Sequence, residues 1–245
     1  MRSFWSDPFL WIHLSGVATV PIFLGLCLLG LAVGSPMLPV WLEVFLVAVA
    51  GIAPVLWMQL FRPFYIFSIL VVAVKPQNLT PSQQRILTRF KTKLNQGLAL
   101  FVAILLAVIL WQIYRWAPLA AGVAPFPPSW RWAGLLLAVA AFLASNLFLQ
   151  VSAGVMAVLL MPESEFAATK PYVLEEIRHD FTIAPWQVDR LLPTFAAETT
   201  VTPAAPAESI PPAAAIRNSS AASIVNPEPP DTNAATSLPQ QSIDK

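Results

Sequence analysis

The side chains of this chain that could do chemistry are few, and each lies inside a long apolar run. Glu43 stands near the start of one run, and a carboxylate in such surroundings is a candidate proton or ion site. His13 stands near the start of another, where an imidazole could ligate a chlorophyll magnesium or one face of a haem. Each has a structural alternative: Glu43 reaching the polar boundary of its run, and His13 hydrogen-bonding to a backbone carbonyl.

Asn146 and Gln150 form a third candidate, because residues four apart share one face of a helix. Their amides could contact a solute or hydrogen-bond to a neighbouring helix, a contact that contributes about 0.6 kcal/mol on average. The same helix carries a seam of small residues that permits close approach of backbones: Gly134, Ala138, Ala141 and Ser145. We expect helix–helix contacts along this face.

The elements that must position these groups are four apolar runs, at residues 9–33, 39–61, 98–114 and 132–161. A bilayer core of about 30 Å needs about 20 apolar residues per helix, and helices satisfy their own backbone groups in hydrocarbon. The composition agrees, since 57% of the residues are hydrophobic and 11% are charged. The sequence predicts an all-α, polytopic membrane protein with a four-helix membrane domain over residues 1–161.

The distribution of basic residues predicts how the chain is threaded. Residues 62–97 hold six Lys or Arg and no Asp or Glu, whereas residues 34–38 hold no charge and the 115–131 loop has arginines only at its two ends. Basic loops stay in the cytoplasm. We therefore expect the 62–97 loop and both termini on the cytoplasmic side.

The basic loop contains two further segments of interest. Residues 64–74 are apolar but too few to cross a bilayer, so we expect an interfacial segment or the continuation of a bent helix. Thr80 and Gln83 are spaced as a capping box, which predicts a helix over 81–94. Arg85, Arg89 and Lys93 form its basic stripe, which either contacts anionic lipid headgroups or only fixes the topology.

Residues 162–192 predict two short cytoplasmic amphipathic helices, over 172–181 and over 186–192, the second carrying Trp186. Segments this small cannot bury a core alone, so they must pack on the membrane, the loop helix or a partner. Asp180 and Asp189 could face the basic stripe. Residues 193–245 are rich in Ala, Pro, Ser and Thr and should form a disordered low-complexity tail.

Several functional classes find no support. The net charge of +1 gives no field for nucleic acid, and the single cysteine, Cys27, excludes an intrachain disulfide or a multi-cysteine metal site. The motifs of nucleotide-binding, hydrolytic and metalloprotease enzymes are absent. We expect no enzyme activity and no cofactor.

Residues 4–13 (FWSDPFLWIH), 39–43 (PVWLE), 51–63 (GIAPVLWMQLFRP) and 182–192 (TIAPWQVDRLL) carry a family resemblance. Over residues 4–192 the chain resembles a cyanobacterial family of membrane proteins with a low-complexity tail. The resemblance implies a cyanobacterial plasma or thylakoid membrane and a role near photosynthetic complexes. It implies no reaction.

The leading functional hypothesis is a non-enzymatic accessory or assembly factor that packs against a larger membrane complex. Its cytoplasmic docking face would include the basic loop helix and Trp186, and its helix contacts would include Asn146 and Gln150. One alternative is a small transporter or ion-coupled carrier that uses Glu43, His13 and the Asn146 region. A weaker alternative is a pigment-binding protein that uses His13.

Overall fold

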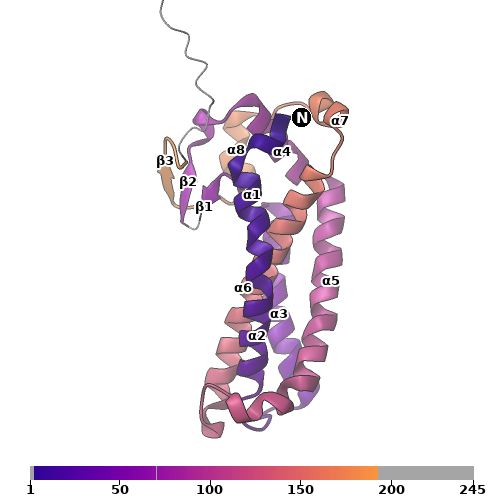
Figure 1. Ribbon diagram of the computed structural model, residues 1–245, viewed down its shortest axis with the longest axis vertical. Helices are drawn as coiled ribbons and strands as arrows, with labels where there is room; N and C mark the ends of the chain where they lie inside the picture. Colours follow the sequence, from indigo (N-terminus) through magenta and orange to yellow (C-terminus); the bar gives the residue numbers. More distant parts are fainter. Residues whose placement is uncertain (1–2, 70, 193–245) are drawn as a thin grey trace, which may run out of the picture. The chain divides into compact units, whose positions relative to one another are not determined.

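The computed structural model describes residues 3–69 and 71–192, so the predicted tail, residues 193–245, lies outside it. Within those ranges, four helical stretches are long and apolar enough to cross a membrane, and they run side by side (Figure 1). Their bounds are Pro8–Leu31, Val40–Phe61, Lys93–Val123 and Pro128–Leu159. The prediction of a helical protein with four membrane-spanning segments is confirmed.

The first span is divided into α1 (Pro8–Ser15), a 3₁₀ turn (Gly16–Thr19) and α2 (Val20–Leu31). Asp7 caps α1, since its carboxylate accepts a hydrogen bond of 2.9 Å from the backbone N–H of Phe9. Pro21 lies in the first turn of α2. Backbone N–H groups in the first turn have no acceptor within the helix, so the absence of an N–H in proline breaks no helical hydrogen bond there. The 3₁₀ turn therefore joins two helices of one continuous span.

The other spans are α3 (Val40–Phe61), α5 (Lys93–Trp116) and α6 (Arg131–Leu159), with short 3₁₀ segments at Ala117–Val123 and Pro128–Trp130 between the last two. Helix α3 continues through Pro54 without a break. Helix α5 begins before the predicted residue 98, because Thr92 caps it by accepting a hydrogen bond from the backbone N–H of Asn95. The apolar run therefore marks only the lipid-soluble part of a longer helix.

Small residues bring α2 and α6 into close contact. A Cβ atom placed on Gly30 would lie 2.6 Å from the carbonyl oxygen of Gly134, and a Cβ on Gly134 would lie 2.5 Å from that of Gly30. Ala138 and Ala141 are buried along the same face of α6. The predicted seam of small residues is thus used by a helix of the same chain.

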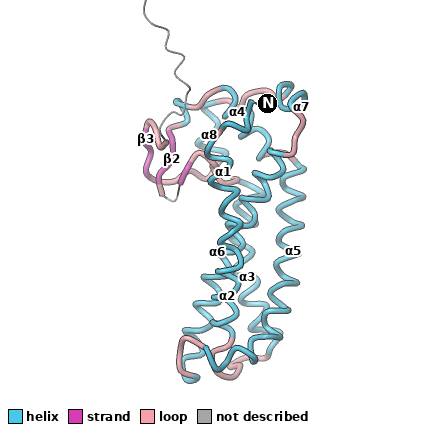
Figure 2. The backbone as a smooth tube through the Cα atoms, viewed as in Figure 1, coloured by secondary structure: helices cyan, strands magenta, loops and turns pink. Residues whose placement is uncertain are grey.

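One end of the bundle carries a folded head, made of residues 3–7, 62–69, 71–92 and 160–192 (Figure 2). It contains α4 (Pro81–Phe90), α7 (Glu163–Ala168), α8 (Leu174–Asp180) and 3₁₀ turns at Ser3–Ser6 and Pro76–Asn78. Its apolar core is fully buried at Tyr65, Phe67, Ile86, Phe166 and Phe181. The segment after the last span therefore packs on the basic loop, one of the three locations expected for it.

A small sheet replaces two predicted elements of the head. Strand β1 (Ser68–Ile69) pairs antiparallel with β2 (Val72–Val74), and β2 pairs parallel with β3 (Trp186–Val188). The alternative of a bent helix continuing over 64–74 was wrong, as was the prediction of a helix over 186–192, whereas the alternative of an interfacial segment over 64–74 stays a prediction. Strand β2 pairs with β3, which is 114 positions away, and periodicity carries no information on such pairing.

The predicted capping box at the start of α4 is present. The Thr80 hydroxyl accepts from the N–H of Gln83 at 3.3 Å, and the Gln83 side-chain oxygen accepts from the N–H of Thr80 at 3.1 Å. However, α4 ends at Phe90 and Lys93 opens α5, so the helix predicted over 81–94 was too long. Arg85, Arg89 and Lys93 therefore do not form a stripe on a single helix.

Candidate functional site: polar groups within and at the ends of the bundle

Glu43 and Arg131 form a buried ion pair at the end of the bundle opposite the head. Glu43 lies in the first turn of α3 and Arg131 is the first residue of α6. Their side chains are 0% and 3% exposed. The carboxylate considered as an ion site is thus neutralised by an arginine of the same chain.

Backbone and phenol groups complete this distal cluster of Glu43, Arg131 and Tyr114. The Arg131 guanidinium donates to the carbonyl oxygens of Leu31 at 2.6 Å and Val33 at 2.9 Å, which end α2 without helical partners. The Glu43 carboxylate accepts from the N–H of Met37 at 2.9 Å and from the Tyr114 hydroxyl at 3.2 Å. The cluster therefore joins all four spans and the first loop.

Asn146 and Gln150 connect α6 to α3 in the interior. The Asn146 amide donates to the carbonyl oxygen of Gly51 at 3.0 Å, and the Gln150 amide donates to the Asn146 side-chain oxygen at 2.8 Å. Gly51 lies in the turn of α3 before Pro54. The expected interhelical hydrogen bond is present and lies within the chain.

Further polar atoms of α3 and α6 are buried within the bundle. Among the described side chains, the amide oxygens of Gln59 and Gln150 and the hydroxyl oxygen of Ser145 are buried and accept no hydrogen bond from a protein donor. Buried polar atoms usually have a partner. The interior of the bundle is therefore more polar than the apolar runs suggest.

His13 is engaged with the backbone. Its Nδ1 donates to the carbonyl oxygen of Phe9 at 2.8 Å, and a second contact reaches the backbone of Ser68 in β1. Its ring lies 5.8 Å from that of Phe64. This is the carbonyl-bonded alternative considered from the sequence. In the described ranges, no three His, Cys, Asp or Glu side chains gather as a metal ion would require.

The basic residues of the predicted stripe have different surroundings. Arg89 forms an ion pair with Glu165 of α7, Arg85 is half-buried, and Lys93 is exposed at the start of α5. The apolar face of α4 is buried in the head core at Ile86, Leu87 and Phe90. That face is unavailable to enter lipid, which leaves only the basic side chains for contact with headgroups.

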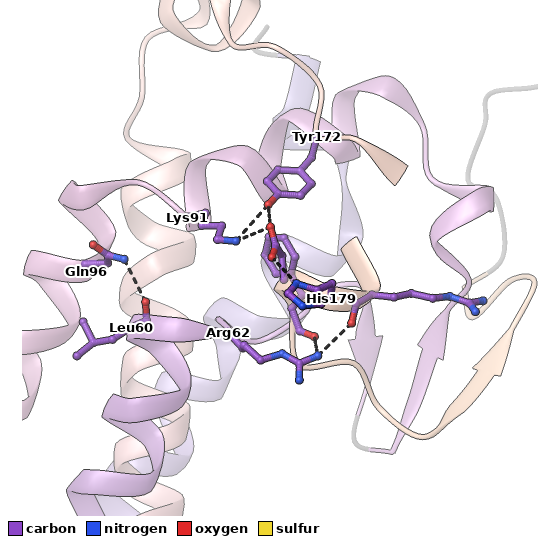
Figure 3. Close-up of polar contacts among 9 residues, drawn as sticks. Leu60, Arg62, Lys91, Gln96, Tyr172 and His179 are labelled. Atoms are coloured by element: carbon purple, nitrogen blue, oxygen red, sulfur yellow. Dashed lines mark hydrogen bonds and ion pairs between the residues drawn. The ribbon is translucent and has the colours of Figure 1, made fainter. Parts of the chain in front are cut away.

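A polar clasp holds α8 against the turn between α4 and α5 (Figure 3). Asp180 pairs with Lys91 and accepts a hydrogen bond from the Tyr172 hydroxyl. These donors, Lys91 first, hold the pKa of Asp180 well below its ordinary value. Burial and the neighbouring Asp180 carboxylate raise the pKa of Tyr172.

Arg62, just after α3, adds to this clasp. Its guanidinium donates to the carbonyl oxygens of Arg178 at 3.0 Å and Phe181 at 3.3 Å (Figure 3). Acidic residues do face the loop, as expected, but Asp180 pairs with Lys91 and Asp189 with Lys75 rather than with the predicted arginines. Trp186 of β3 is 66% exposed on the head.

Sequence reasoning missed Arg131, Tyr114 and Lys91. A signal for Arg131 was available, because the predicted threading places it at the same bundle end as Glu43, and an acid near a bilayer needs a partner. Tyr114 had been assigned to a span boundary, which also placed it at that end. No local signal distinguished Lys91 from the other basic residues of the loop.

These features define a multi-pass helical membrane protein with a small folded head at one end of its bundle. The chain belongs to the low-complexity tail membrane protein-like family, whose model matches residues 6–193. No curated protein and no solved structure matches the chain.

Proposed function

We propose that this protein is a non-enzymatic accessory or assembly factor that binds a larger membrane complex through its head. The observation that carries the proposal is the contrast between the interior and the head. Inside the bundle, Glu43, His13 and Asn146 are each engaged by groups of the same chain. On the head, Trp186 and Val173 are 66% and 52% exposed.

The edge of the sheet gives this surface a mode of binding. In the described sheet, β3 lies at one edge, so its outer side has no strand partner. An exposed edge strand is a template for pairing with another chain, and an adjacent tryptophan is a typical interface anchor. Lys93 and Arg85 add positive charge to the same end of the molecule.

The orientation that we propose places the head in the cytoplasm, with both termini on that side. It is supported by the basic residues of the head, since the loops at the distal end carry no lysine or arginine beyond Arg115 and Arg131 at their borders. In a cyanobacterium, the membrane would be the plasma or the thylakoid membrane, and the proposed partners would be photosynthetic complexes.

Cross-linking in native membranes followed by purification in mild detergent tests the role. We expect a stable membrane-protein partner that is lost in Trp186→Ala and retained in Trp116→Ala. Trp116 is 58% exposed at the far end of α5 and serves as the matched control. Recovery of the wild-type chain alone would refute the accessory role, and equal retention in both variants would refute the docking surface.

The orientation has its own test. Cys27 is buried, so a cysteine introduced at Lys93 is the selective target for an impermeant thiol reagent. We expect labelling only after the cytoplasmic side is exposed. Labelling from the opposite side would overturn the threading.

One observation favours a second candidate, the ion-coupled carrier: the three buried oxygens of Gln59 in α3 and of Ser145 and Gln150 in α6. A polar interface within lipid is a feature of solute or proton pathways. Purified protein in vesicles loaded with a pH-sensitive dye would test it. Proton flux that falls in Gln59→Leu would favour the carrier over the accessory role.

A further inference from the structure

An apolar groove lies between the bundle and the small sheet. It has a volume of about 200 Å³, and its lining includes Ile12 and His13 of α1, Phe64 and Ile69 from the chain around β1, and Phe148 and Val151 of α6. Three segments far apart in sequence therefore build it. His13 is the one residue of this lining that can carry a charge, and the others are apolar side chains and a glycine.

The walls of the groove are held in place by packing and by the backbone contacts of His13. Gly16 allows Phe148 to approach, since a Cβ atom on Gly16 would lie 3.0 Å from the Phe148 ring. Phe148 also stacks on Phe23, with ring centroids 5.6 Å apart. His13 uses its polar atoms on the backbone of Phe9 and Ser68, so its ring adds an apolar surface to the groove.

The groove is continuous with the surface that faces lipid. Ile12 both lines the groove and is 38% exposed, and exposed apolar side chains continue along the same span at Val17 (44%) and Ile22 (64%). In a membrane protein, hydrocarbon is the solvent of this surface. A dry apolar cavity of about 150 Å³ admits a molecule of the size of benzene, so this groove has room for part of a hydrocarbon chain.

We propose that the groove binds one acyl chain of a membrane lipid, which fills the space between α1, α6 and the sheet. The chain packs against Ile12, Phe64 and Phe148 and thereby fastens the sheet to the bundle. The site depends on membrane insertion and not on the protein partner proposed above, so either can fail without the other.

Native mass spectrometry of the protein extracted from phospholipid vesicles tests the site. We expect one phospholipid retained per chain in the wild type and in Ile22→Trp, and loss of that lipid in Ile12→Trp, whose indole fills the groove. Ile22 is the matched control because it is exposed on the same span away from the groove. No retained lipid in the wild type, or equal retention in both variants, overturns the proposal.

A measurement on the wild type covers the case in which Ile12→Trp does not fold. Vesicles containing a phospholipid with a diazirine on its acyl chain are irradiated, and the labelled residues are mapped. We expect labelling at residues 12–16, 64–69 and 147–151 to exceed that at Phe101 and Ile104, which are 62% and 58% exposed on α5. Uniform labelling overturns the site, and a pigment found with the purified protein in place of phospholipid overturns the choice of ligand.

Discussion

The two ends of the bundle hold their charges in different ways. At the distal end, the Glu43–Arg131 pair is withdrawn from solvent, and its remaining hydrogen-bonding groups are satisfied by Tyr114 and by loop backbone. In the head, the Lys91–Asp180 and Lys75–Asp189 pairs are partly exposed, and the apolar core beneath them is large. The stability of the distal end depends on one buried ion pair, whereas that of the head depends on the burial of apolar side chains.

Loss of the distal carboxylate should have the largest effect. Glu43→Gln leaves the Arg131 guanidinium buried without a counter-charge, which costs about 3–5 kcal/mol of unfolding free energy. Denaturation in detergent measures it, with the exposed Glu175→Gln on α8 as control. The double variant with Arg131→Gln should recover part of the loss; full additivity would show that the two side chains do not act as a pair.

The close contact between α2 and α6 should come next. Gly30→Ala places a methyl group against the Gly134 backbone and should cost about 1–3 kcal/mol. Gly25→Ala, on the same helix with no atom within 4 Å of the new Cβ, should be neutral or stabilising. Equal effects of the two substitutions on thermal denaturation would contradict the contact.

The interior hydrogen bond should have a smaller effect. Asn146→Leu removes the donor to the Gly51 carbonyl and should cost about 1 kcal/mol, because membrane hydrogen bonds contribute little net stability. The same denaturation experiment measures it. A loss as large as that of Glu43→Gln would mean that the interior, not the distal cluster, holds the bundle together.

The smallest effect is expected in the head, and it should depend on pH. Lys91→Met should cost about 1 kcal/mol or less at neutral pH. Asp180 has a lowered pKa in the folded protein, so its pairing stabilises the fold above the ordinary carboxylate pKa of about 3.9 and is lost as the pH falls through the lower, folded value.

The difference between wild type and Lys91→Met should therefore disappear in acid. The exposed Lys93→Met is the control and should show no acid-dependent difference. A loss in Lys91→Met that is equal at neutral and acid pH would assign the effect to the packing of the lysine stem rather than to its charge.

Much of the architecture is determined by the sequence itself. Solubility in lipid is a property of each run of residues alone, so all four spans could be predicted, and the first, second and fourth lie within a few residues of their observed bounds. The cap at Thr80 could also be predicted, because a cap acts on the backbone within three residues of itself.

The tertiary structure decided which distant groups meet. Glu43 and Arg131 are 88 positions apart, and residues 72–74 pair with 186–188, which are 114 positions away. Such pairings depend on how the helices pack and on which backbone groups remain unsatisfied, and neither is encoded in a local pattern. For that reason Glu43 suggested an ion site, residues 64–74 suggested a helix or interfacial segment, and the groove beside His13 had no local signature.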